Sequence, residues 1–166
     1  MKPAALILIA TALIMNRPSY AQSFAVDIST QVAPQVFEPN HYVKVAWPHV
    51  QRNAGWTFSD DQWMPVPVGG IPRPVTSSGQ LWILKAFPLK RGLAPTYVAR
   101  LVKNGDLNQS VGARIGATGT FADTVTIPLD FQDFANPGDT YQIWLYVTST
   151  ESIIDANSLH SWWSGQ

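Results

Sequence analysis

The chain has 166 residues, no cysteine, 46% hydrophobic side chains, and eleven basic residues balanced by eleven acidic ones. This length suits one domain with a sizeable core, and the lack of cysteine excludes disulfide crosslinks and thiol chemistry. The balanced charge argues against a nucleic-acid partner or an anionic membrane surface, because such partners select strongly basic proteins.

Residues 1–21 are expected to form a signal peptide. A positive start at Lys2 precedes an apolar run from Ala4 to Met15, and Ser19-Tyr20-Ala21 offers the small residues that signal peptidase accepts. The run is too short to cross about 30 Å of hydrocarbon, and no later segment is apolar enough to span a membrane. We therefore expect a secreted protein, either extracellular or periplasmic, with no membrane span.

Strand patterns dominate the rest of the chain. Residues 22–36 are ambiguous and are expected to form an arm that leads into a single domain of residues 37–166. Apolar and polar residues alternate with a period of two in six segments: Tyr42–Trp47, Leu81–Phe87, Thr96–Val102, Val111–Ile115, Thr124–Leu129 and Thr140–Val147. Turn signals separate them at roughly ten to fifteen residues, which predicts an all-β antiparallel sandwich of the jelly-roll type.

Four segments of the second half resemble the C1q/TNF-like jelly-roll domains in order and spacing. They are Pro74–Leu84, Tyr97–Gly105, Thr124–Leu129 followed by Pro137–Leu145, and Ser158–Gly165. The chain departs from the family's pattern because it stops soon after its final Ser-Gly, has no collagen-like stalk upstream, and matches nothing over residues 60–70. The resemblance implies a homotrimer that serves as a binding or adhesive head, and it does not imply catalysis.

The sequence offers little for catalysis or for a cofactor. His160 lies between Ser158 and Ser161, but neighbouring strand positions face opposite sides of a sheet, so a Ser-His-Asp relay is not expected. The histidines are too scattered for zinc. Asp139 and the Asp155–Asn157 run offer oxygen ligands for calcium, although turn capping also accounts for them. We expect no enzyme, no metal site and no cofactor, and calcium at these loops is the alternative left open.

The seven tryptophans are the most informative residue type. Trp162 and Trp163 are adjacent, so only one of them can enter the core of a sandwich, and Trp82 is expected to join it there. Trp56 and Trp63 flank the Asp60-Asp61 pair. Because exposed aromatic rings beside loops mark contact surfaces, Trp56, Trp63, Asp60 and Asp61 are the candidate ligand-binding residues.

The strand that follows the Asn136–Asp139 turn is apolar on both faces. One face is predicted to fill the core, and it carries Tyr141, Ile143, Leu145 and Val147. Trp144 and Tyr146 point the other way, where a neighbouring subunit can cover them. Together with Trp163, they are the predicted trimer interface.

Three hypotheses for function follow. The leading one is a secreted, non-enzymatic binding or adhesion module that presents loops to an unidentified protein or glycan, and the resemblance implies that this module is a homotrimer. The second is a monomeric carbohydrate-binding sandwich that uses exposed tryptophans. The third is a structural fibre or decoration protein that shares the fold and the trimer.

Overall fold

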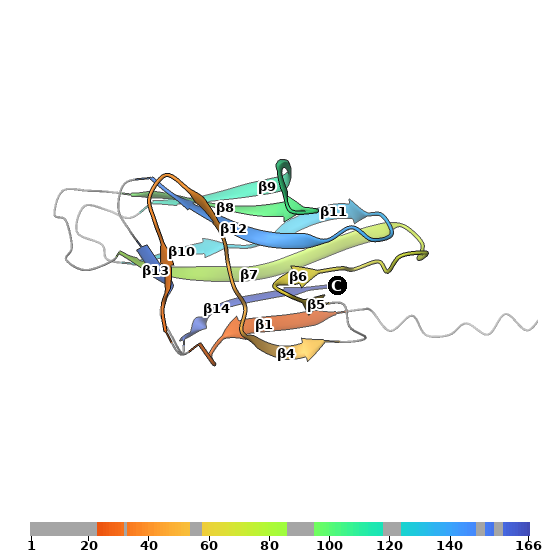
Figure 1. The fold of residues 1–166 in the computed structure, drawn as a ribbon, viewed down its shortest axis with the longest axis horizontal. Helices are drawn as coiled ribbons and strands as arrows, with labels where there is room; N and C mark the ends of the chain where they lie inside the picture. Colours follow the sequence, from red (N-terminus) through yellow and green to blue (C-terminus); the bar gives the residue numbers. More distant parts are fainter. Residues whose placement is uncertain are drawn as a thin grey trace, which may run out of the picture.

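The computed structural model describes residues 23–31, 33–53, 58–85, 95–117, 124–148, 152–154 and 158–166. The predicted signal peptide lies outside these ranges. The described part of the chain forms two antiparallel sheets that pack face to face, with β8, β9 and β12 in one layer and β1, β4, β7 and β14 in the other (Figure 1). No helix within the described ranges is long and apolar enough to cross a membrane.

The larger sheet has eight strands in the order β2-β13-β7-β14-β1-β4, and β10 and β11 also pair with β7. Its strands are β1 (Phe24–Ile28), β2 (Gln35–Phe37), β4 (His49–Asn53), β7 (Arg73–Lys85), β10 (Thr124–Pro128), β11 (Phe131–Ala135), β13 (Ser152–Ile154) and β14 (Ser158–Gly165). The first and last strands lie side by side, because β1 pairs with β14. This pairing joins the two ends of the domain.

The smaller sheet has six strands in the order β5-β6-β12-β8-β9, and β3 also pairs with β12. Its strands are β3 (Tyr42–Lys44), β5 (Phe58–Ser59), β6 (Gln62–Trp63), β8 (Thr96–Lys103), β9 (Asp106–Ala117) and β12 (Tyr141–Val147). Strand β12 alternates as predicted, and its four expected core residues, Tyr141, Ile143, Leu145 and Val147, are all buried. The local period of two was therefore enough to orient this strand.

The prediction that residues 22–36 form an arm outside the domain is wrong. Strand β1 lies between β14 and β4 within the larger sheet, and its residues Phe24, Val26 and Ile28 are buried in the core. Strand β2 also begins inside this segment and pairs with β13. The segment is short, and its burial depends on partners at the far end of the sequence.

Aromatic rings fill the core between the sheets. The ring of Phe24 lies 5.1 Å from that of Trp63 and 4.7 Å from that of Trp163. Gly165 passes directly over this cluster, since a Cβ atom there would lie 2.6 Å from Phe24 and 2.9 Å from Trp63. Such distances are too short for any side chain, so the packing of the rings requires glycine at this position.

Two predictions about individual tryptophans fail at this cluster. Trp63 and Trp163 are both 0% exposed, so Trp63 cannot line a ligand face and Trp163 cannot contact a second subunit. The adjacent Trp162 points outward and is 38% exposed. The two rings therefore take opposite faces, as predicted, but Trp163 and not Trp162 is the one that enters the core. Trp82, expected in the core, is half-buried on the outer face, because its neighbours Leu81 and Ile83 take the inner positions.

Candidate functional site

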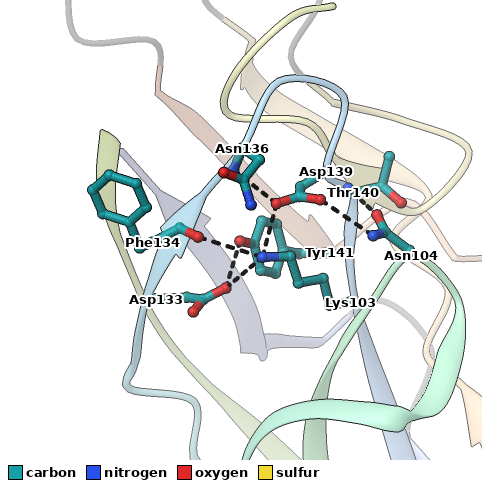
Figure 2. Close-up of polar contacts among 8 residues, drawn as sticks. All are labelled: Lys103, Asn104, Asp133, Phe134, Asn136, Asp139, Thr140 and Tyr141. Carbon is teal, nitrogen blue, oxygen red and sulfur yellow. Dashed lines mark hydrogen bonds and ion pairs between the residues drawn. The ribbon is translucent and has the colours of Figure 1, made fainter. Parts of the chain in front are cut away.

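A charged cluster joins β8, β11 and the turn before β12 (Figure 2). The Lys103 ammonium lies 2.7 Å from a carboxylate oxygen of Asp139 and 3.1 Å from one of Asp133. The Tyr141 hydroxyl donates to the same Asp133 oxygen at 2.7 Å. One cation is thus held between two carboxylates, at a place where three separate segments of the chain meet.

The cluster keeps all of its charged groups ionised. Burial alone would lower the pKa of Lys103, but hydrogen bonds to Asp139 and Asp133 outweigh it and raise that pKa. Burial opposes ionisation of the two carboxyls, yet hydrogen bonds from Tyr141 to Asp133 and from Lys103 to both lower their pKa values. Burial and the adjacent Asp133 raise the pKa of Tyr141. A lysine held protonated has no lone pair, so it can act neither as a nucleophile nor as a base.

Two turns are fastened to this cluster. The backbone N–H of Asn136 donates to Asp139 Oδ2 at 2.7 Å, which is the capping role predicted for Asp139. Asn104, in the left-handed region at φ 55°, donates to Asp139 Oδ1 at 3.2 Å and accepts from the Thr140 N–H at 2.9 Å. The carboxylate of Asp139 is therefore shared among Lys103, Asn136 and Asn104. Calcium binding at Asp139 stays a prediction, and it would require the Lys103 ammonium to move away from this carboxylate.

A Ser-His-Asp set occurs at Ser29, His49 and Asp27, but its geometry does not suit catalysis. The Nδ1 atom of His49 contacts both the Ser29 hydroxyl, at 2.9 Å, and the Asp27 carboxylate, at 2.8 Å. A catalytic relay needs the serine on one ring nitrogen and the aspartate on the other. Burial opposes ionisation of Asp27, but hydrogen bonds led by that from Ser29 outweigh it and lower the Asp27 pKa. The set fastens β4 to β1.

The remaining candidates for chemistry also separate. Ser161 is buried and accepts a hydrogen bond from the Trp82 N–H at 2.9 Å, whereas His160 is exposed on the other face and lies 5.1 Å from the Trp82 ring. This opposition of Ser161 and His160 is the one expected from their adjacency. Within the described ranges, no group of three or more His, Cys, Asp or Glu side chains could hold a metal ion.

The predicted ligand face around the Asp60-Asp61 pair is not assembled. Both aspartates form the turn between β5 and β6 with left-handed backbone angles, φ 50° and 60°. Asp61 accepts a hydrogen bond from the Trp47 N–H at 2.6 Å and lies 3.7 Å from the Lys44 ammonium, while Asp60 is exposed. Trp56 lies outside the described residues. With Trp63 in the core, these aspartates have a structural role in the turn.

The outer face of the larger sheet carries a patch that we call the apolar strip. It consists of five outward-facing residues: Val36, Trp82, Leu84, Ile153 and Trp162. The register places Val36, Ile153 and Leu84 in one row across β2, β13 and β7. Val36 is 51% exposed and Trp162 38%, and the other three are half-buried. The sequence prediction missed this strip because it placed Trp82 in the core and assigned the outward position to Trp163 instead of Trp162.

The outer face of the smaller sheet carries a second patch, which we call the aromatic platform. It consists of Tyr42, Lys44, Arg100, Trp144 and Tyr146, all half-buried. The rings of Tyr42 and Tyr146 lie 5.0 Å apart, and the Arg100 guanidinium lies 4.8 Å over the Tyr42 ring. Trp144 and Tyr146 are thus outward-facing, as the alternation of β12 predicted. Their role as a trimer interface stays a prediction.

No protein-family model matches the chain, and no curated protein matches it. Similar folds occur among solved structures. The structure of murine APRIL at pH 5.0 has a TM-score of 0.54 and 10% identity over 86% of this chain and 95% of that one. The structure of Eiger TNF from S. frugiperda has a TM-score of 0.50 and 9% identity over 86% and 89%. The likeness confirms the predicted all-β, C1q/TNF-like jelly-roll fold.

Proposed function

We propose that this chain is a secreted, non-enzymatic binding module that assembles as a homotrimer through the larger sheet. The observation that carries the proposal is the apolar strip. An antiparallel sheet with one face in water is expected to be polar on that face, whereas this face presents two tryptophans and three aliphatic side chains. Contiguous exposed apolar area of this kind marks contact surfaces in folded proteins.

Assembly also suits the composition of the chain. A protein without cysteine gains no stability from disulfides. Burial of the strip against a second copy would contribute about 25 cal/mol for each Å² of apolar surface removed from water. A closed cyclic arrangement gives every copy the same contacts, and three copies are what the resemblance to C1q/TNF-like domains implies.

The sequence instead placed the interface at Trp144 and Tyr146, and the two placements can be separated by experiment. Light scattering on residues 22–166 should report three copies for the wild type. Trp162→Glu should yield a monomer, because it buries a charge in the interface, whereas the matched Trp144→Glu should leave the trimer intact. A monomeric wild type at micromolar concentration would contradict the trimer. Dissociation by Trp144→Glu alone would move the interface to the smaller sheet.

The non-enzymatic part of the proposal rests on the side chains already described. The lysine is held protonated, and the histidine of the Ser29 set has both partners on one nitrogen. A binding module needs neither a base nor a nucleophile, since a rigid sandwich displays surfaces and three copies multiply weak contacts.

A carbohydrate-binding monomer that uses Trp56 and Trp63 loses support, because Trp63 is buried. A structural fibre protein would share the trimer but continue to larger assemblies in the same measurement.

A further inference from the structure

We infer that the aromatic platform binds the carboxylate-bearing sugars of an acidic polysaccharide. The inference rests on the proposed binding function and assigns the ligand to a face on the opposite side of the sandwich from the apolar strip. It also moves carbohydrate binding from the Trp56 and Trp63 region, where the sequence had suggested it, to the smaller sheet.

Two rows of side chains cross the smaller sheet in register. One row runs through Tyr42, Tyr146, Val98 and Ile115, and the next through Lys44, Trp144, Arg100 and Ala113. Adjacent strands lie about 4.8 Å apart, so four positions in a row span about 14 Å, which is the length of a short oligosaccharide. The first row is aromatic and aliphatic, and the second carries both cations. A sugar chain along the rows would meet apolar rings on one side and positive charge on the other.

Arg100 supplies the group that recognises a carboxylate. Its guanidinium is held over the Tyr42 ring at 4.8 Å, and its Nε atom is buried without a hydrogen-bond partner. None of the ion pairs formed within the described ranges involves Arg100. A planar guanidinium that is held by stacking keeps its paired N–H donors for a planar carboxylate, which it binds through two parallel hydrogen bonds.

The charge of the platform favours an anion. Lys44 adds a second cation on the same face, with its side chain 36% exposed. The Lys44 ammonium lies 3.7 Å from a carboxylate oxygen of Asp61 and donates to the Asp60 carbonyl oxygen at 3.3 Å. Since Lys44 already has an acidic neighbour and Arg100 forms no ion pair within the described ranges, Arg100 is the cation beside the aromatic rings that is available to an anion.

The backbone of this face favours a sugar over an acidic peptide. An extended peptide usually binds to a sheet by adding a strand to a free edge. Here β12 is paired with β8 on one side and with β3 and β6 on the other, and β8 is paired with β12 and β9. Of the three strands that carry the platform, only β3, which is three residues long, is paired on one side alone within the described ranges. Most of the platform thus offers side chains and no free strand edge. The flat rings of Trp144 and Tyr146 match the apolar faces of sugar rings. The Trp144 N–H donates to the Gln142 amide oxygen and the Tyr146 hydroxyl to that of Asn40, so amide groups lie beside the polar tips of both rings.

The test uses residues 22–166 and oligogalacturonate, with the methyl-esterified form of the same oligomer as the matched uncharged probe. Calorimetry should show binding of the acid form and binding at least about tenfold weaker for the ester, because the ester removes the carboxylates. Arg100→Met and Tyr146→Ala should each weaken binding of the acid form by about tenfold or more. Arg100→Lys keeps the charge without the paired donors and should be intermediate.

Arg114→Met is the control variant, because the Arg114 guanidinium also lies 4.8 Å over an aromatic ring, that of Phe131, at a different place. It should bind as the wild type does. Equal binding of acid and ester, or equal losses in Arg100→Met and Arg114→Met, would overturn the inference, as would equally tight binding of polyglutamate.

Light scattering on each variant separates the sugar-binding proposal from the trimer proposal. Dissociation of the trimer by Tyr146→Ala would make the platform a subunit contact, whereas sugar binding by a monomeric wild type would contradict only the trimer.

Discussion

Replacing Lys103 with methionine tests the charged cluster that holds three segments of the domain together. The substitution keeps most of the apolar stem but leaves Asp133 and Asp139 without their shared cation. Breaking a fully buried pair costs about 3–5 kcal/mol. Because the side chains of Lys103, Asp133 and Asp139 are 12–25% exposed to solvent, this pair is only partly buried. We therefore expect a smaller loss in the free energy of unfolding, of about 2 kcal/mol.

A loss of that size should lower the melting temperature by about 4–8 °C, since a domain of this length shifts by about 2–4 °C for each kcal/mol. Lys44→Met is the matched control. Its ammonium lies 3.7 Å from Asp61 and is 36% exposed, so its loss should cost at most about 0.5 kcal/mol. Differential scanning calorimetry of both variants provides the comparison. A Lys103→Met protein as stable as Lys44→Met would refute the reasoning.

The cluster also predicts a dependence on pH. The pKa values of Asp133 and Asp139 are lowered in the folded state, so their contribution is complete above the unfolded value of about 3.9 and is lost as the pH falls through the folded values. The raised pKa of Lys103 acts at the other end, where stability is lost only as the pH rises through the folded value. As the pH falls below about 4, the wild type should therefore progressively lose its advantage over Lys103→Met.

Two further substitutions test the aromatic core. Gly165→Val should destabilise the domain by more than about 2 kcal/mol, because its Cβ would lie 2.6 Å from Phe24, and a thermal melt close to that of the wild type would contradict this packing. Trp163→Ala should cost about 3–5 kcal/mol in urea unfolding, since its side chain is fully buried. For an isolated subunit, Trp162→Ala should cost less than about 1 kcal/mol, and equal losses for the two tryptophans would contradict their opposite orientations.

Local patterns predicted the features that depend on neighbours in the sequence. The alternation along β12 placed Tyr141, Ile143, Leu145 and Val147 in the core, because successive side chains of a strand face opposite sides. The capping role of Asp139 followed from the composition of its turn. The order of strand and turn signals was sufficient for the jelly-roll fold, which the solved structures share.

Features that depend on pairing between distant segments could not be predicted in the same way. Alternation shows that Trp162 and Trp163 face opposite sides, but the register of β14 with β1 decides which one enters the core, and there Trp163 pairs with the buried Val26. Trp63 lies in a strand of two residues, which is too short to show a period. The Arg100 and Tyr42 contact also joins separate strands, so neither residue stood out in the sequence.

The two patches together predict how assembly should affect binding. The sheets pack face to face, so a trimer that buries the apolar strip would turn all three aromatic platforms outward. A long acidic polysaccharide could then contact more than one platform, and its apparent affinity would rise through effective concentration, whereas a short oligosaccharide would contact only one. Trp162→Glu should therefore weaken binding of long polygalacturonate by about a hundredfold. It should leave unchanged the affinity for trigalacturonate, a sugar of three units that contacts only one platform. Calorimetry with free sugars of both lengths in solution measures this difference, and an equal loss for the two lengths would show that the platform and the strip are not independent surfaces.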